Sequence, residues 1–191
     1  MRKGGRASTG ASGFRLQASG PSPIHARNEH RAGRSAVRVL KSAAGRFLAD
    51  LGLEDRELSI LVVGDRAIRA LNKQWRGKDQ PTDVLSFGLT ASRKPLAASR
   101  KRAAAAGQAL GDVVISLDTA RRQAKEGGWP LSVELRRLLA HGLLHCLGHD
   151  HEQPGQARKM ARAERSLLGA EGMVGAAFST ELKSGPRSRS L

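Results

Sequence analysis

Three histidines in the segment 141–151 constrain this chain more than any other feature. His141 and His145 lie four residues apart in a stretch with helical periodicity, so both imidazoles are expected on one helix face. Gly148 allows the chain to turn, which can bring His151 back as a third ligand. Three nitrogen ligands without a fourth protein ligand are typical of a catalytic zinc site, which keeps one position for water or substrate. The alternative is a His-rich helix end without a metal.

The residue after the first histidine separates this motif from that of the metalloproteases. The spacing is that of H-E-x-x-H-x-x-G-x-x-H, in which the Glu is the general base for peptide hydrolysis. In this chain Gly142 stands at that position. The sequence therefore predicts the metal geometry without the protease chemistry, which speaks against a zinc peptidase.

A second group of polar residues lies between two apolar elements, in the segment 71–87. Arg76 has a planar, permanently charged guanidinium that suits phosphate oxygens, and Lys73 and Lys78 flank it. Functional loops often have this composition, and we expect the two lysines to bind substrate. The alternative, which composition alone favours, is a solvated loop whose cations pair with nearby aspartates.

Hydrophobic periodicity predicts an α+β domain, a small mixed β-sheet covered by helices. Strands are expected at 58–63, 83–88 and 111–116, with a further edge strand at 24–30. Helices are expected at 35–50, 65–71, 118–126, 131–147 and 156–168, the second and third capped by Asp65 and Asp118. The long helix 131–147 carries the first two histidines, so the zinc site is expected at its end.

The positive charge is concentrated outside the predicted core. The chain has 191 residues and a formal net charge of +16, of which +14 lies in residues 1–34, 91–107 and 183–191. These segments contain few large apolar residues and cannot bury enough surface to offset the entropy of ordering. We therefore expect a basic, disordered arm (1–34), a catalytic domain (35–172) with a basic loop (91–107), and a basic tail (173–191).

Charge and cysteine content limit the partners and the compartment. The basic excess favours a polyanion, nucleic acid first and an anionic membrane surface second. No apolar run approaches the roughly 18 residues of a membrane helix, so no membrane span is expected. Of the two candidates nucleic acid is the expected partner, with no membrane. The single cysteine excludes a disulfide framework and fits a reducing cytoplasm, so a cytoplasmic location and no disulfide-linked partner are expected. An organellar transit peptide within residues 1–28 is the alternative.

Three blocks of sequence together resemble the YbeY family of single-strand endoribonucleases. That family has Asn-x-x-aromatic-Arg-x-Lys-Asp-x-Pro-Thr-Asp-Val-Leu-Ser-Phe, then Leu-Gly-Asp-[Ile/Val]-Val-Ile-Ser, then His-Gly-x-Leu-His-x-x-Gly-x-Asp-His. All three match in order, within a resemblance that covers about residues 35–170. The departures are Trp75 where the family usually has Tyr, Gly88 for a usual Pro, and His149 for a frequent Tyr.

The resemblance implies a zinc-dependent endoribonuclease with one Zn2+ per chain, carried by His141, His145 and His151. It also implies a catalytic Arg76 in the cleft with the metal. The implied substrate is single-stranded rRNA, and the implied process is 16S-type rRNA 3′-end maturation and ribosome quality control. The small ribosomal subunit and its assembly factors are the implied partners.

The chemistry that these residues suit is metal-assisted phosphodiester cleavage. Zinc can polarise a phosphoryl oxygen and lower the pKa of bound water, and Arg76 can stabilise the developing charge. The motif contains no obvious general base, so zinc-bound water and the RNA 2′-OH both stay open as the nucleophile. A non-catalytic ribosome-assembly factor is the rival function.

Neighbours of the histidines are expected to have secondary roles. His149 is predicted to be an exposed turn residue, with a spare ligand or a proton shuttle as alternatives. Asp150 and Glu152 could orient an imidazole, and Asp150 could equally cap the turn. Cys146 points about 100° away from His145 on a helix and is predicted to be a core residue.

Overall fold

The structure is a computed structural model that describes residues 24–88, 109–149 and 154–169 of the chain. In chain order the elements are β1 (Ile24–Asn28), α1 (Arg34–Asp50), β2 (Glu57–Val63), α2 (Asp65–Arg76), β3 (Val84–Gly88), β4 (Ala109–Ser116), α4 (Leu117–Gly127), α5 (Leu131–Cys146) and α6 (Pro154–Leu168). The predicted loop 91–107, the tail 173–191 and His151 lie outside the described residues.

The strands form one mixed sheet in the order β1-β2-β4-β3. β1, β2 and β4 run parallel, and β3 pairs antiparallel with β4 through the register Val84↔Ile115 to Gly88↔Gly111. This confirms the predicted α+β class and the small mixed sheet. β1 confirms the edge strand expected at 24–30, so this part of the predicted arm 1–34 belongs to the sheet.

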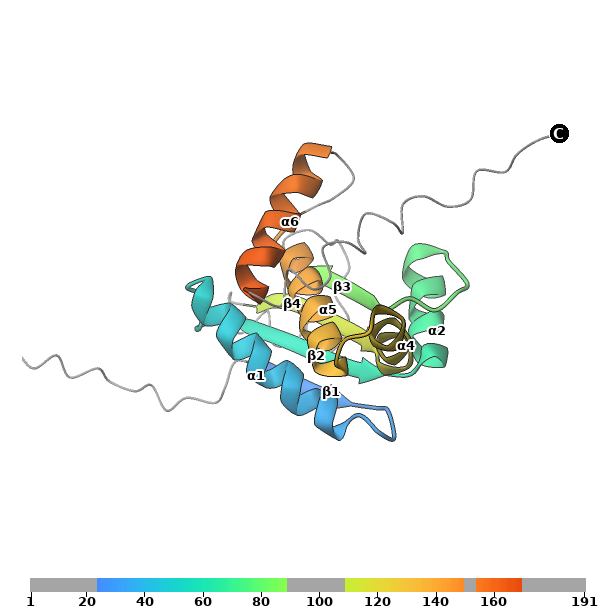
Figure 1. Cartoon of the computed structure of the whole chain (residues 1–191). Coiled ribbons are helices and arrows are strands. Elements are labelled where there is room, and N and C mark those ends of the chain that lie inside the picture. Colours follow the sequence, from blue (N-terminus) through green and yellow to red (C-terminus); the bar gives the residue numbers. More distant parts are fainter. Residues whose placement is uncertain (1–23, 89–108, 150–153, 170–191) are drawn as a thin grey trace, which may run out of the picture.

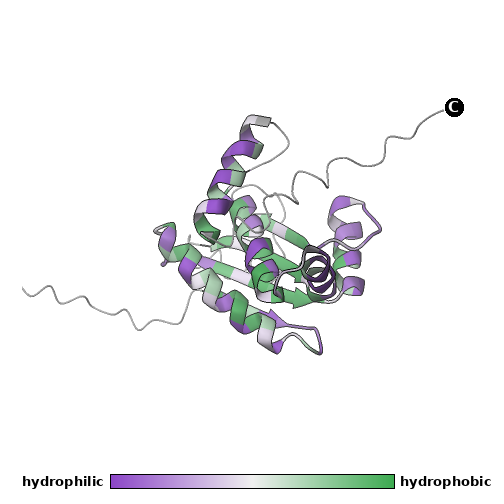
Figure 2. Cartoon of the chain, in the orientation of Figure 1, coloured by the Kyte–Doolittle hydropathy of each residue, from purple (hydrophilic) through white to green (hydrophobic). Residues whose placement is uncertain are grey.

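Alternate residues of the strands serve two different hydrophobic clusters. Ile60 and Val62 of β2 face the larger cluster, which α1 and α5 cover, whereas Val63 belongs to a smaller cluster on the opposite face. Helix α2 closes that smaller cluster with Ile68 and Trp75. In Figure 1, α1 and α5 lie across one face of the sheet, and Figure 2 shows apolar residues on the strands and on the inner sides of the helices.

Helix α2 is longer than the sequence predicted. It continues to Arg76 and ends at Gly77, whose φ of 71° is the left-handed conformation that glycine adopts without strain. The helix continues because Trp75 lies on its apolar face and contacts Phe87 with ring centroids 5.7 Å apart. Lys73 and Arg76 therefore belong to the last helical turn and not to a loop.

A hydrogen-bond network joins the segments that follow β1, β2 and β4. His30 Nε2 lies 3.0 Å from Asp118 Oδ1, and Asp118 Oδ2 accepts a hydrogen bond from the Asp65 backbone N–H at 3.1 Å. The Asp65 carboxylate in turn accepts hydrogen bonds of 2.6–2.7 Å from Ser116, Thr119 and Arg122. Burial acts to raise the pKa of Asp65, but these bonds outweigh it and the pKa lies below its ordinary value.

The same network shows why the predicted caps were wrong. Gly64 occupies the N-cap of α2, and Ser116 caps α4 by accepting a hydrogen bond from the Thr119 N–H at 3.3 Å. Asp118 lies one residue inside its helix, where it contacts His30 from a distant part of the chain. A carboxylate next to a helix start predicts a local cap, whereas Asp118 contacts His30 from a distant part of the chain.

Helix α5 packs very closely on the sheet at Gly142. A Cβ built there would lie 2.8 Å from Val113 Cγ1 and 3.3 Å from Val84 Cγ2. The residue that stands where metalloproteases have Glu therefore points at the strands, with no space for a side chain.

No helix in the described part of the chain has the length and apolar character of a membrane span.

Candidate metal centre

His141 and His145 converge on one face of α5. Their Nε2 atoms lie 3.1 Å apart, and their ring planes meet at 78°. Two nitrogens each about 2.0–2.1 Å from a tetrahedral zinc ion would lie about 3.3 Å apart, so the pair fits two of the ligands. Within the described ranges no group of three His, Cys, Asp or Glu side chains gathers at one point, and the predicted third ligand, His151, lies outside them.

Glu164 supports the first histidine from α6. Its Oε1 lies 2.7 Å from His141 Nδ1, and the contact is partly buried. An ionised carboxylate at this distance favours the tautomer with the proton on Nδ1, which leaves the Nε2 lone pair for a metal. This is the carboxylate–histidine arrangement of many zinc sites.

Sequence reasoning did not find Glu164. It considered Asp150 and Glu152, which lie outside the described residues. The available indication was periodicity, because Glu164 follows the buried Met160 by four residues and precedes the buried Leu167 by three. A carboxylate on the apolar face of a helix needs a partner.

A hollow of about 270 Å³ lies beside His141 and Glu164. Its lining includes His141 and Glu164 together with Asp83, Gln123, Glu126, Trp129, Glu134 and Arg137. Asp83 is held in place by hydrogen bonds from the Val84 N–H at 2.7 Å and from the Gln123 side chain at 3.0 Å. The hollow thus combines an imidazole, several carboxylates and a guanidinium.

Arg137 is a fixed cation in this hollow, and the sequence analysis had not selected it. Its Nη1 donates to Glu134 Oε2 at 2.8 Å, and its guanidinium lies 4.9 Å from the centroid of the Trp129 ring. Trp129 Nε1 donates to the same Glu134 oxygen at 2.6 Å. Burial raises the pKa of Glu134, and Asp83 adds to the effect, whereas Arg137 and Trp129 oppose it. Arg137 stands four residues before His141, one turn away on the same helix.

The three cations predicted around residue 76 have different environments. Lys73 Nζ forms an ion pair with Asp79 Oδ2 at 3.0 Å, and Arg69 Nε binds the other oxygen at 2.8 Å. The hydrogen bonds from Arg69 and then Lys73 lower the pKa of Asp79 to about 2. The alternative prediction, a cation paired with a nearby aspartate, is therefore confirmed for Lys73.

Arg76 and Lys78 are both exposed. In the described part of the chain, neither side chain has an ion-pair or hydrogen-bond partner within contact distance. Helix α2 packs on the sheet face opposite α5, and no contact between Arg76 and either histidine is observed among the described residues. That Arg76 and the metal lie in one cleft remains a prediction.

Cys146 is confirmed as a core residue. It is 1% exposed, and its Sγ lies 3.8 Å from the backbone oxygen of Asp112. Burial raises its pKa to about 12, and Asp112 adds to the shift. His149 lies at the predicted turn, but it is half-buried, so the expected exposure was wrong. Its backbone N–H donates to the Leu144 oxygen at 3.0 Å, and Gly148 before it has a φ of 86°.

Comparison with known proteins decides the family. The family model described as Endoribonuclease YbeY matches residues 24–171. The chain belongs to the YbeY endoribonuclease family. YbeY membership supports an endoribonuclease role and an RNA substrate, and the match starts at the first residue of β1.

Relatives in the YbeY family cover most of the chain. The protein named Endoribonuclease YbeY from Anaeromyxobacter sp. (strain Fw109-5) is 56% identical over 151 residues, 79% of this chain and 73% of that protein. The one from Myxococcus xanthus is 50% identical over 162 residues, 85% of this chain and 52% of that protein. The solution structure of TM1509 from Thermotoga maritima has a TM-score of 0.53 at 22% identity, covers 87% of this chain and 99% of that chain, and supports the fold alone.

Proposed function

We propose that this chain is a zinc-dependent endoribonuclease that cleaves single-stranded RNA. The observation that carries the proposal is the convergence of two imidazole Nε2 atoms beside a hollow that also holds a guanidinium, with Glu164 hydrogen-bonded behind the first ring. When bound, zinc would polarise a phosphoryl oxygen and lower the pKa of water at this position. His141, His145 and His151 would hold it.

The chain's own residues have distinct tasks in this proposal. Glu164 keeps the proton on His141 Nδ1 and so orients the ring. Glu134 and Trp129 hold Arg137, whose guanidinium can bind a phosphate oxygen and stabilise charge that develops on it. Arg76 is proposed to bind a second phosphate oxygen, with Lys78 beside it.

Family membership also guides the choice of substrate and place. We propose that the enzyme acts in 3′-end maturation of 16S-type rRNA and in ribosome quality control, in contact with the small ribosomal subunit and its assembly factors. An rRNA substrate and a single, buried cysteine suit a cytoplasmic location. Single-stranded RNA is preferred because sequence-specific proteins reach unstacked bases in single strands and not in A-form duplexes.

The test is a comparison of two histidine variants in the full-length chain. His145→Ala should lose most of its zinc by elemental analysis and lose cleavage of an RNA that carries the 3′ end of 16S-type rRNA. His25→Ala is the matched control, because His25 lies on β1 and pairs with Glu57 at 3.4 Å. Full zinc content and normal cleavage in His145→Ala would refute the proposal, and zinc loss without any RNA turnover by the unmodified chain would indicate a binding protein.

A further inference from the structure

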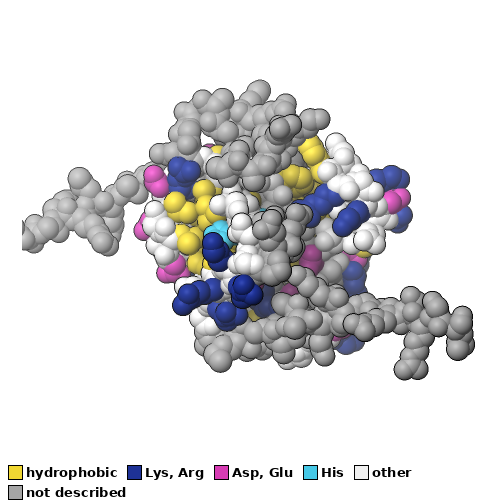
Figure 3. Space-filling model, turned by 90° about the horizontal axis from the view of Figure 1, so that it is seen from above, with side chains coloured by type: hydrophobic (Ala, Val, Ile, Leu, Met, Phe, Trp, Pro, Cys, Tyr) yellow, Lys and Arg dark blue, Asp and Glu magenta, His cyan; other side chains and the backbone are white. Residues whose placement is uncertain are grey.

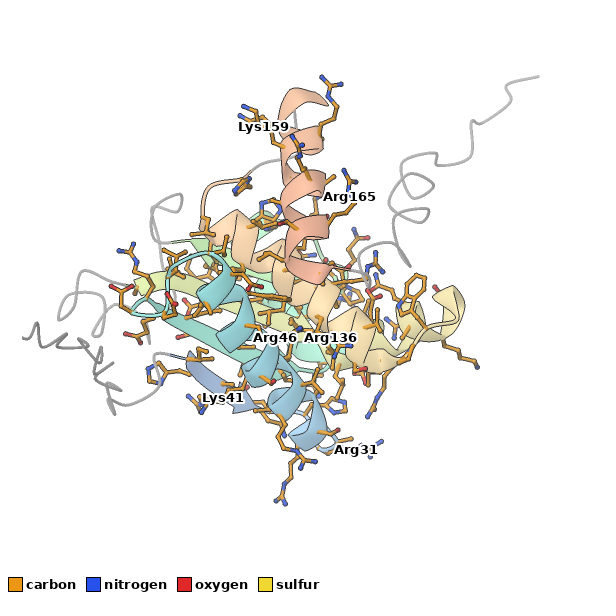
Figure 4. The ribbon with its side chains drawn as sticks, turned by 60° about the vertical axis from the view of Figure 1, so that its left-hand side comes forward. Arg31, Lys41, Arg46, Arg136, Lys159 and Arg165 are labelled. Atoms are coloured by element: carbon orange, nitrogen blue, oxygen red, sulfur yellow. The ribbon has the colours of Figure 1, made fainter. Side chains whose placement is uncertain are left out.

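A second hollow lies between α1 and α5, away from the histidines. It has a volume of about 520 Å³ and is lined by Arg38, Val39, Ser42, Ala43, Arg46 and Arg136. We call it the arginine groove. Figure 4 shows Arg46 and Arg136 next to each other where the two helices meet.

The α1 sequence builds one wall of the groove. Arg38, Ser42 and Arg46 follow one another at intervals of four residues and therefore form a stripe about 12 Å long on one side of the helix. The neighbouring stripe contains Ala43 and Phe47, which are buried in the core. The apolar side anchors the helix, so the arginines have a rigid base.

None of the described residues that line the groove is acidic. Some other arginines of the described domain form ion pairs, for example Arg69 with Asp79 at 2.8 Å and Arg122 with Asp65 at 2.7 Å. Within the described ranges, no carboxylate lies within ion-pair distance of Arg38 or Arg46. The only acid on α1 is Asp50, its last residue. Like charges gathered in one concave surface raise the local positive potential, which a polyanion relieves.

The groove and the metal centre lie on different sides of α5. Arg136 precedes His141 by five residues, which is about 7.5 Å along the helix axis and about 140° around it. The groove is therefore separate from the reaction hollow, although one helix connects the two rigidly. Figure 3, a view from above, shows Lys and Arg side chains gathered beside an apolar area with a histidine.

We propose that the arginine groove is a second RNA site, which binds the phosphodiester backbone of the substrate at a distance from the cleaved bond. The choice of RNA as the polyanion rests on the proposed function. Guanidinium groups bind phosphate oxygens in bidentate fashion, and no aromatic residue lines the groove, so it recognises the backbone and not the bases.

The test compares two charge-matched double variants of the full chain. The first variant, Arg38→Glu/Arg46→Glu, reverses the charge of the two groove arginines on α1. The control, Arg66→Glu/Arg121→Glu, makes the same change in net charge at exposed positions of α2 and α4. Binding to a single-stranded RNA of about 20 nucleotides is measured by fluorescence anisotropy with a chelator present, over a range of salt. The groove variant should bind at least about tenfold more weakly than the control, with a salt slope smaller by about 1.4 for two lost phosphate contacts.

Further measurements keep the outcome decisive. The milder variant Arg38→Gln/Arg46→Gln should show a smaller loss of RNA affinity and an unchanged circular dichroism spectrum. Equal affinities of the two glutamate variants for the longer RNA would overturn the proposal.

A loss of polyglutamate binding with RNA binding intact would also overturn it, in favour of an acidic protein partner. Absence of cleavage by the unmodified chain would refute the proposed function alone, because the binding comparison does not depend on turnover.

Discussion

The contact between Glu164 and His141 leads to a quantitative prediction about metal affinity. Removing a carboxylate that orients a zinc-ligating imidazole typically weakens the metal by about 10- to 100-fold, or about 1.4–2.7 kcal/mol. A hydrogen bond to a charged group contributes about 1.5–3 kcal/mol, which agrees with that range. The Glu164 side chain is 27% exposed and the His141 side chain 36%, so solvent screening places the expectation at the lower end.

The assay is a competition titration with a chromophoric zinc chelator at pH 7. Glu164→Gln keeps an oxygen acceptor but removes the charge, and we expect zinc affinity to fall about tenfold; Glu164→Leu removes both and should fall further. Glu126→Gln is the control, because Glu126 lines the same hollow without a hydrogen bond to the ring. If Glu164→Gln binds zinc as tightly as Glu126→Gln does, the orienting role of Glu164 is refuted.

Three further predictions concern packing, acid stability and the predicted phosphate contact. Gly142→Ala should destabilise the fold in urea, because overpacking against Val113 costs about 1–3 kcal/mol, more than the gain in helix propensity of up to about 1 kcal/mol. Gly45→Ala, on the exposed side of α1, should instead stabilise the fold. Asp65→Asn should cost about 1–3 kcal/mol at pH 7. The folded pKa of Asp65 is depressed, so its contribution to stability is present above the unfolded value near 3.8 and is lost as the pH falls through the folded pKa. The urea curves of variant and parent should therefore converge once the pH lies below that folded pKa. Arg76→Glu should abolish RNA cleavage with zinc retained, and near-normal cleavage would reduce Arg76 to a surface residue.

Local sequence pattern was sufficient to predict most of the helices and strands and the convergence of two of the proposed ligands. The β-branched run of 58–63 predicted β2, and the spacing of His141 and His145 predicted their convergence, because both depend only on neighbours in sequence. Contacts between residues of different helices and strands could not be predicted from local sequence pattern. Trp75 extends α2 through its contact with Phe87, and Glu164 reaches His141 from another helix, although neither pair is linked by a period along the chain.

The attachment of α6 has a consequence for how the protein would lose metal on heating. Helix α5 lies in the domain core, so its amide hydrogens, for example that of Leu143, should exchange only through global unfolding. Helix α6 packs mainly against α5, through residues such as Met160, and should open with a smaller free energy. Opening of α6 would withdraw Glu164 while His141 and α5 keep their places. Zinc, if bound as proposed, should therefore be held about tenfold more weakly already below the temperature at which the sheet melts.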